Sequence, residues 1–191
     1  MIIMTITVFG KGNMGKAIGG NFEKAGQKVV YAGHDFKDAL GDIVVLAVPY
    51  GAVDSILEAH KAELSGKVII DITNPVDFST MDSMVVPADS SAAAEIQKKV
   101  PEAKVVKGFN TTFAATLVSG KVGDNVTTVL LASDSKEAKE EVAKALDGSG
   151  LAVKDAGALK RARELEAMGF LQITMAVSEQ FGWTGGFAVI Q

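Results

Sequence analysis

The chain has 191 residues, a formal net charge of −4 at pH 7 and no cysteine. The lack of cysteine excludes disulfides, thiolate catalysis and zinc sites built on cysteine. The mild acidity, without a block of like charges, gives no support for binding to nucleic acid or to an anionic membrane surface. We therefore expect neither of these partners.

A chain of this length, with 48% apolar residues, can bury a substantial core. We expect one domain over residues 1–191, with a C-terminal helix and an aromatic tail from about residue 157. The apolar N-terminus lacks a basic stretch and a clear cleavage site, so we interpret it as a core strand and not as a signal peptide. No apolar run reaches the roughly 18 residues of a membrane-spanning helix. We therefore expect a cytoplasmic protein without membrane contact.

Strand-like apolar runs recur along most of the chain. Runs such as "IVVLAV" and "KVIIDI" are continuously apolar, which is typical of strands buried on both faces of a parallel sheet. The predicted strands are Ile3–Phe9, Lys28–Ala32, Ile43–Val48, Lys67–Ile72, Lys104–Lys107, Val126–Ala132 and, more weakly patterned, Leu151–Asp155.

Helical patterns lie between these strands. The first has apolar residues at helical spacing from Met14 to Ala25 and ends at Gly26, and the third begins with serines that can cap it. The alternation predicts an α/β fold of the Rossmann type: a doubly wound, mostly parallel sheet with helices on both faces. Only about ten residues join the second strand to the third, which is short for a crossover. The other predicted helices span Val53–Glu63, residues 90–100, residues 133–146 and Leu159–Met175, and residues 76–89 are predicted to form a long loop.

The sequence GKGNMG lies where the first strand ends and the first helix begins. In this context Gly10 permits a tight turn, Gly12 lets the backbone approach a pyrophosphate, and Gly15 allows close packing of helix on strand. The helix N-terminus offers free N–H groups to the phosphates. The alternative is an ordinary glycine-rich turn, but the parallel-sheet pattern favours a dinucleotide site.

The identity of the dinucleotide depends on the end of the second strand. NAD sites place an acidic side chain there, whereas this strand ends at Ala32 without one, and Asp35 comes later. A 2′-phosphate would favour Lys11 or His34. We therefore favour NADP over NAD, while His34 as a simple loop residue stays an alternative.

Five motifs in order, "GKGNMG", "AVPYGAV", "DITNP", "VVKGFNT" and "DAGALKRARELEAM", span nearly the whole chain. In this order they resemble the coenzyme F420-dependent NADP oxidoreductases, a family that includes related NADPH-dependent reductases and the reductase domain of the STEAP metalloreductases. The resemblance implies a Rossmann domain that binds NADP and passes hydride to or from a flavin-like ring. A flavin or deazaflavin is therefore a possible acceptor.

The resemblance also implies where the ligands bind. The family's Gly-Ser-Arg segment for the 2′-phosphate falls on Ala32, Gly33 and His34, so its serine and arginine are absent here. Asn110 and Thr111 are expected on the substrate side. The expected cofactor-binding residues are Gly10, Lys11, Gly12, Asn13, Met14, Gly15, Gly33, His34, Val48, Pro49, Tyr50, Asn74 and Pro75.

Taken alone, several of these residues have ordinary structural interpretations. Asn-Pro and Asn-Thr are good turn formers, and Tyr50 is either a stacking surface or a loop aromatic. The tail "FGWTGGFAVIQ" contains Trp183, which we expect either to cover the substrate or to pack in the core or against a second subunit. The long last helix and this tail suggest a homodimer.

The sequence shows no clear acid–base machinery and no metal-ligand spacing. His60 lies in the charged stretch "LEAHKAEL" and is interpreted as solvated surface. We therefore expect no catalytic residue and no metal, which fits hydride transfer between two held rings. Two other functions stay open: a dinucleotide-binding redox sensor without turnover, and a reductase of the imine or hydroxyacid type. The small-molecule redox acceptor is not identified by the sequence.

Overall fold

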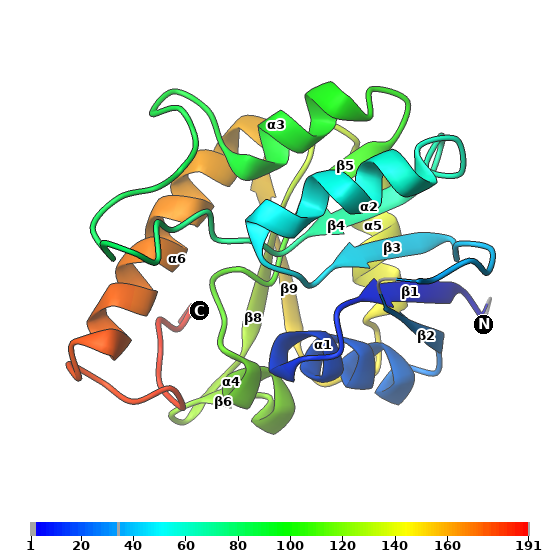
Figure 1. Cartoon of the computed structure of the whole chain (residues 1–191). Coiled ribbons are helices and arrows are strands. Elements are labelled where there is room, and N and C mark those ends of the chain that lie inside the picture. Colours follow the sequence, from blue (N-terminus) through cyan, green and yellow to red (C-terminus); the bar gives the residue numbers. More distant parts are fainter. Residues whose placement is uncertain (1–2, 34, 191) are drawn as a thin grey trace.

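Within residues 3–33 and 35–190, which the computed structural model describes, seven strands form one sheet (Figure 1). The strands lie in the order β2-β1-β3-β4-β5-β8-β9. Their bounds are β1 Thr5–Phe9, β2 Lys28–Ala32, β3 Ile43–Leu46, β4 Val68–Asp71, β5 Lys104–Lys107, β8 Thr128–Ala132 and β9 Ala152–Gly157. A separate hairpin is formed by β6 Lys121–Val122 and β7 Asn125–Val126.

Helices cover both faces of this sheet (Figure 1). Those of the described chain are α1 Asn13–Lys24, α2 Val53–His60, α3 Ala92–Lys99, α4 Ala114–Ser119, α5 Lys136–Ala145 and α6 Ala162–Val177, with short 3-10 turns η1 Tyr50–Ala52 and η2 Leu159–Arg161. Ser91 caps α3 by accepting a hydrogen bond from the Ala94 N–H at 3.0 Å, as the serines before this helix predicted. None of the described helices has the length and apolar character needed to cross a bilayer.

The sheet is mostly parallel. β1 pairs in parallel with β2 and β3, and β4 and β5 continue in the same direction. β8 joins β5 antiparallel through the pair Lys107↔Ala132, and β9 runs parallel to β8. The predicted doubly wound, mostly parallel Rossmann-type sheet is confirmed. Because β1 to β5 share one direction, their carboxyl ends lie at one edge of the sheet.

The order of the strands reverses at β1. β2 lies on one side of β1 and β3 on the other. The link between them has no helix in its described residues, 33 and 35–42, in agreement with the short spacing in the sequence. Gly41 lets this link pass close to β1, because a Cβ there would lie 2.2 Å from the Thr5 carbonyl oxygen. Connections that leave neighbouring strands toward opposite faces open a crevice at the carboxyl edge, where such folds bind ligands.

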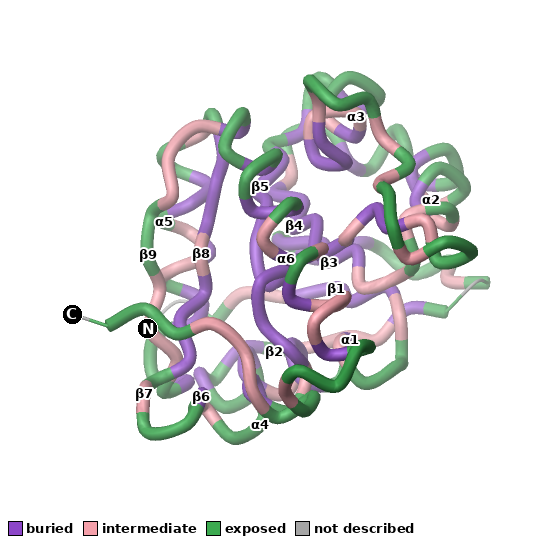
Figure 2. The backbone as a smooth tube through the Cα atoms, turned by 90° about the vertical axis from the view of Figure 1, so that its left-hand side faces the viewer, coloured by how far each residue is buried: buried purple, intermediate pink, exposed green. Residues whose placement is uncertain are grey.

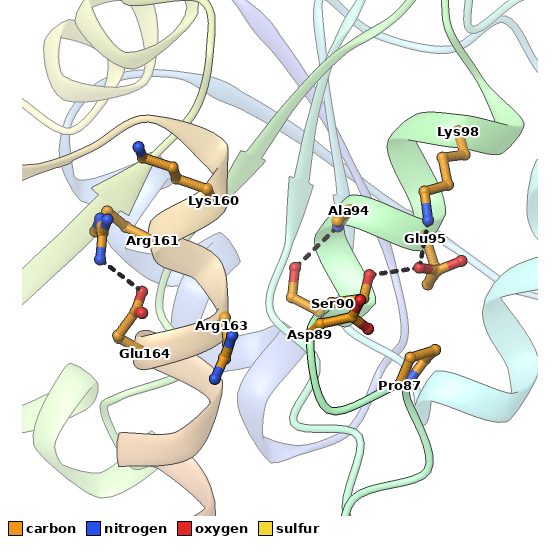
Figure 3. Close-up of a pocket in the computed structure, with 11 residues that line it drawn as sticks. Pro87, Asp89, Ser90, Ala94, Glu95, Lys98, Lys160, Arg161, Arg163 and Glu164 are labelled. Carbon is orange, nitrogen blue, oxygen red and sulfur yellow. Dashed lines mark hydrogen bonds and ion pairs between the residues drawn. The ribbon is translucent and has the colours of Figure 1, made fainter.

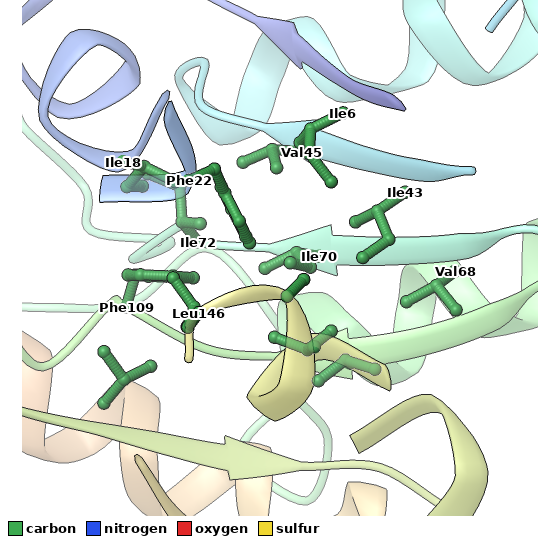
Figure 4. Close-up of a cluster of buried hydrophobic side chains, with 14 of the residues drawn as sticks. Ile6, Ile18, Phe22, Ile43, Val45, Val68, Ile70, Ile72, Phe109 and Leu146 are labelled. Carbon is green, nitrogen blue, oxygen red and sulfur yellow. The ribbon is translucent and has the colours of Figure 1, made fainter. Parts of the chain in front are cut away.

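Two apolar layers hold the sheet between its helices. On one face, Ile6, Ile70 and other strand residues pack with Ile18 and Phe22 of α1 and with Phe109 (Figure 4). On the other face, α2, α3 and the start of α6 pack against the alternate residues of β3, β4 and β5. The central strands are therefore buried on both sides (Figure 2), which explains their unbroken apolar sequence.

The segment between β5 and β8 contains structure that the sequence analysis did not predict. α4 has only six residues, "AATLVS", and ends at Gly120 in the left-handed conformation, with φ 71°. The β6–β7 hairpin then takes Val126, so β8 begins at Thr128 and not at Val126. A six-residue helix and two-residue strands carry too little periodicity to be recognised from the sequence.

Candidate functional site

The segments selected from the sequence meet at the carboxyl edge of the sheet. Gly10–Gly15 follow β1, Gly33 follows β2, and Val48–Tyr50 follow β3. Asn74–Pro75 and Asn110–Thr111 follow β4 and β5. Parallel strands bring these five turns together, whereas Trp183 comes from the C-terminal tail.

The glycine turn is closed at two positions and open at the third. Gly10 has φ 110°, and a Cβ there would lie 2.0 Å from the Ala47 carbonyl oxygen. A Cβ on Gly15 would lie 2.1 Å from the Gly10 carbonyl oxygen. A Cβ on Gly12 would meet nothing within 4 Å, and Gly12 is exposed. The turn therefore packs tightly against the sheet and leaves free space over Gly12, as the approach of a pyrophosphate requires.

The N-terminus of α1 faces this free space without a side-chain cap. Gly12 is the N-cap residue, and because glycine has no side chain it cannot accept a hydrogen bond from the N–H groups of the first turn. The first turn also has no acidic residue, and Asn13 is exposed while Met14 packs partly on the core. The first N–H groups and the positive end of the helix dipole are thus available to an anion.

A cavity of 460 Å³ opens beside the glycine turn. It lies between the ends of β1, β2 and β3 and the helix α2, and its lining is mostly apolar, which suits a flat aromatic ring. The residues that line it are Phe9, Gly10, Lys11, Ala32, Gly33, Val48, Ala52, Ser55, Ile56, Ala59 and His60.

Lys11 places a positive charge at the end of β2. A Cβ built on Gly33 would have the Lys11 Nζ at 3.8 Å, so the ammonium lies beside this turn. Asp35 lies two residues further along and is exposed. His34, which the sequence analysis proposed for the 2′-phosphate, lies outside the described residues.

His60 is buried, and its interpretation as solvated surface was wrong. Only 8% of it is exposed, and its ring lies 5.3 Å from that of Phe9, centroid to centroid. The Nδ1 atom is 3.3 Å from the Glu63 Oε1 atom, and this hydrogen bond holds the pKa of the Glu63 carboxyl below its usual value. Val53 and Leu57 are buried on the same helix face. The apolar stripe that runs 53, 57, 60 was the signal that indicated burial of this histidine.

Asn74 and Asn110 are joined by hydrogen bonds at this edge. Asn74 Nδ2 donates to the Asn110 carbonyl oxygen at 2.9 Å, and Asn110 Nδ2 donates to Asn74 Oδ1 at 2.9 Å and to the Leu165 carbonyl oxygen at 2.8 Å. Phe109, with φ 63°, makes the turn after β5 that aims Asn110 at Asn74. Gly169 lets α6 touch the pair, because a Cβ there would lie 2.2 Å from Asn74 Oδ1.

Two polar atoms at this end lack a partner. The Thr73 Oγ1 and Asn110 Oδ1 atoms are buried and make no hydrogen bond within the described part of the chain. Thr73 and Asn110 are 4% and 3% exposed. Unpaired buried polar atoms cost free energy, and they concentrate where a ligand or an ordered water completes the structure.

Tyr50 and Trp183 are placed differently from the other predicted residues. Tyr50 is partly buried against the core beneath α2 and α3, and burial raises the pKa of its phenol. Trp183 is half-exposed, and its ring lies 4.9 Å from that of Phe113, which precedes α4. The tail folds back because the Phe187 N–H donates to the Gln172 Oε1 atom at 3.1 Å. Tyr50 is therefore partly packed on the core while its contact with a cofactor stays a prediction, and Trp183 lies beside Phe113, the residue that precedes α4.

Sequence reasoning missed an ionic cluster under the edge. Lys107 at the end of β5 is fully buried, and its Nζ lies 2.8 Å from both Asp71 Oδ2 and Glu166 Oε1. Burial raises the pKa of the Glu166 carboxyl, and the nearby Asp71 carboxylate raises it further, while the Lys107 ammonium acts in the opposite direction. The signal was a lysine and an aspartate ending apolar strands, where charged residues are rarely buried unless paired.

A second cavity, of 440 Å³, lies between α3 and the start of α6 (Figure 3). Two ion pairs lie at this cavity: Arg161 lies 3.2 Å from Glu164, and Lys98 lies 2.8 Å from Glu95. Ser90 also donates to Glu95. Asp89, Lys160 and Arg163 also line this groove, so its lining carries more charged side chains than that of the cavity at the glycine turn. The described residues contain no cluster of side chains suited to hold a metal ion.

Comparison with known proteins gives consistent results. Residues 33–75 match the family described as NADP oxidoreductase, coenzyme F420-dependent. The F420-dependent NADP reductase of Methanocaldococcus jannaschii is 31% identical over 163 residues, which cover 80% of this chain and 71% of that protein. The metalloreductase STEAP3 of Rattus norvegicus is 32% identical over 106 residues, or 56% of this chain and 20% of that protein. A structure from Arthrobacter sp. FB24, provisionally described as an F420-dependent NADP-reductase, matches with a TM-score of 0.84 and 26% identity, covering 98% of this chain and all of that one.

Proposed function

The chain belongs to the family of coenzyme F420-dependent NADP oxidoreductases, and we propose that it transfers a hydride between NADP(H) and a small acceptor with a flavin-like ring. The observation that carries the proposal is the open space over Gly12, beside the apolar cavity that Gly10 and Lys11 help to line. The Asn74–Asn110 pair lies at the same carboxyl edge of the sheet, after β4 and β5. In such folds a dinucleotide binds along this edge of the sheet.

The residues at the edge fit such a cofactor in distinct ways. The free N–H groups at the start of α1 would hold the pyrophosphate, and the cavity lined by Val48 and Ile56 would hold the adenine. Asn74 and Asn110 would hold the nicotinamide end, where the unpaired Asn110 Oδ1 still needs a donor. Gly10, Gly12, Gly15, Asn13, Met14, Gly33, Pro49 and Pro75 would shape the same groove.

Lys11 supports NADP as the cofactor. Its ammonium beside Gly33 would meet the 2′-phosphate at the end of β2, where the family's serine and arginine are absent. No acidic residue ends this strand to favour the free ribose of NAD. The contribution of His34 stays a prediction.

The chemistry follows from what the ring end contains. Bound NADPH supplies the hydride itself. Asn74, Asn110 and Thr111 are neutral, so their task is to hold a ring in place and to keep water away from it. The relatives from Methanocaldococcus and Arthrobacter are described as F420-dependent, and coenzyme F420 is therefore the first acceptor to test, followed by flavins. The region beside Thr111 and Trp183 is the proposed acceptor side.

The experiment is a titration of the purified protein with NADPH and NADH, followed by turnover assays with coenzyme F420 and with FMN. Tighter binding of NADPH and its oxidation by either acceptor support the proposal. Binding without oxidation by any acceptor would instead indicate a redox sensor, and the absence of binding would refute both. The homodimer and the cytoplasmic location stay predictions, and light scattering of the same sample tests the first.

A further inference from the structure

A buried lysine connects the segments that form the ring end of the site. We infer that Lys107 is a positioning residue that sets the geometry of this end by holding Thr73 and α6 in place. The inference rests on the proposed function, because it assigns a role to the nicotinamide end of that site. Its basis is the set of contacts that the Lys107 ammonium makes.

All three N–H bonds of the Lys107 ammonium are used inside the protein. The Nζ atom lies 2.8 Å from Asp71 Oδ2, 2.8 Å from Glu166 Oε1 and 2.5 Å from the Thr73 carbonyl oxygen. An ammonium has three donors and no acceptor, so the group is fully satisfied. These three acceptors belong to β4, to α6 and to the turn after β4, so one atom ties together three parts of the fold.

Thr73 is fixed through both of its backbone groups. Its carbonyl accepts from Lys107, and its N–H donates to Asp71 Oδ1 at 2.9 Å. The next residue is Asn74, which pairs with Asn110. A turn residue held on both sides has little freedom to rotate, so the direction in which Asn74 leaves the strand depends on the Lys107–Asp71 pair.

The third contact fixes α6. Glu166 Oε2 also accepts from the Ala92 N–H at 2.8 Å, at the N-terminus of α3. The residue before Glu166 is Leu165, whose carbonyl accepts from Asn110 Nδ2. One turn further, Gly169 lies against Asn74. The Lys107–Glu166 contact therefore sets the register of α6 on the asparagine pair.

Stability alone is a poor explanation for this cluster. Buried ion pairs lose much of their attraction to desolvation, and apolar replacements are often as stable. Two carboxylates share one buried ammonium here, which makes the arrangement still less favourable. Its geometric effect, however, is confined to residues that reach the carboxyl edge. That location favours a positioning role.

The chain contains a matched control. Lys139 is 9% exposed, and its Nζ lies 2.6 Å from Asp155 Oδ1 and 2.9 Å from the Gly157 carbonyl oxygen. This lysine also joins a carboxylate to a backbone carbonyl, but it links α5 to β9. Lys139→Met therefore removes a similar clamp without touching the turns after β4 or β5.

The test compares binding of the two ends of the cofactor. The variant is Asp71→Asn with Lys107→Met, which keeps an acceptor for the Thr73 N–H and leaves Glu166 on the α3 N-terminus. The probes are 2′,5′-ADP, which lacks the nicotinamide, and NADPH, whose reduced ring fluoresces. We expect the Kd of the variant for 2′,5′-ADP to stay within about twofold of the wild-type value. The ratio of NADPH affinity to 2′,5′-ADP affinity should fall about tenfold. The fluorescence anisotropy of the bound ring falls with it, and Lys139→Met changes neither quantity.

Each other outcome refutes a specific statement. If the wild type binds neither probe, the proposed function fails. If it binds both and the double variant keeps the wild-type anisotropy and NADPH affinity, the positioning role of Lys107 fails alone. If the double variant binds both probes more weakly to the same extent, or if Lys139→Met shows the same loss, the Lys107 cluster contributes only to general stability. If the double variant does not fold, Lys107→Arg replaces it, because a planar guanidinium cannot satisfy the same three acceptors and the same loss of anisotropy is expected.

Discussion

Asn74 and Asn110 hold each other through two hydrogen bonds of 2.9 Å, from the Asn74 amide to the Asn110 carbonyl oxygen and from the Asn110 amide to Asn74 Oδ1. The Asn110 amide also reaches the Leu165 carbonyl oxygen, which fixes the orientation of both side-chain amides. The pair therefore joins the ends of β4 and β5 to α6. Among the described residues, none donates a hydrogen bond to the buried Asn110 Oδ1 atom.

Removal of either asparagine is expected to leave a buried polar atom of the other residue without its hydrogen-bond partner. Asn74→Ala and Asn110→Ala should each lower the free energy of unfolding by about 1–3 kcal/mol. The double variant should lose less than the sum, with a coupling of about 0.5–3 kcal/mol. Denaturant unfolding of the four proteins in the cycle measures this. Strictly additive losses would show that the two side chains act independently.

The glycines of the first turn are expected to separate folding from binding. Gly12→Ala meets open space, and its φ of −77° suits alanine, so stability should change by less than about 1 kcal/mol. Its methyl group would occupy the approach to the pyrophosphate, so NADPH binding should weaken by about tenfold or more. Gly10→Ala instead places a methyl against the Ala47 carbonyl at φ 110°, and should cost about 3 kcal/mol or more in unfolding free energy. Wild-type NADPH affinity in a folded Gly12→Ala protein would exclude a phosphate site at this turn.

Lys11→Ala is expected to change the choice between dinucleotides. A charge-assisted hydrogen bond contributes about 1.5–3 kcal/mol, so NADPH affinity should fall about tenfold while NADH affinity stays nearly constant. The loss should shrink at high ionic strength, because the contact is exposed. Isothermal titration at two salt concentrations measures both effects, with Lys16→Ala, an exposed lysine on α1, as the control. Equal losses of affinity for NADPH and NADH would show that Lys11 does not bind the 2′-phosphate.

The sheet was predictable because its signal is local. Continuous apolar runs such as Ile43–Leu46 report burial on both faces, and this run is a strand, β3, with a neighbour on each side. The antiparallel pairing of β8 was not predictable, because one pair of residues, Lys107 and Ala132, carries the junction and neither strand's sequence records direction. The glycine turn was equally predictable, because three closely spaced glycines at a strand–helix junction indicate a tight turn or a close approach of the backbone.

The location of the candidate site was predictable from the sequence, but the hydrogen bonds between its residues were not. The order of the motifs along the chain placed Asn74 and Asn110 at one edge of the sheet. Their mutual hydrogen bonds, however, depend on the left-handed backbone of Phe109, and a phenylalanine in the sequence does not indicate such a conformation. The contact with Gly169 links residues far apart in sequence, and only an isolated glycine in a helical stripe indicated a packing reason. His60 was misjudged because its neighbours are charged, although its helical position matches the buried stripe.

Glu166 is expected to make stability depend on pH. Burial raises the pKa of its carboxyl above the ordinary 4.5, so the folded protein holds this proton more strongly than the unfolded chain. As the pH rises from 4.5 through the folded pKa, the wild type therefore loses stability relative to Glu166→Gln, which cannot titrate. The difference in unfolding free energy should grow in favour of the glutamine variant over this range and then level off. A difference that shrinks with rising pH would show that the pairing with Lys107 outweighs burial.

Gly169 is expected to control the contact between α6 and the asparagine pair. A Cβ there would lie 2.2 Å from Asn74 Oδ1 and 2.9 Å from the Asn110 carbonyl oxygen, so Gly169→Ala must push the helix away or break the pair. Alanine favours a helix over glycine by about 1 kcal/mol, and a stabilised protein would be the result if the helix were free to accept it. Gly20→Ala on α1, where a Cβ meets nothing within 4 Å, shows that gain and is the control. We expect Gly169→Ala to lower the unfolding free energy and the anisotropy of bound NADPH together, as measured by denaturant titration and fluorescence. If it matches Gly20→Ala in both measurements, close approach at Gly169 is not required for the site.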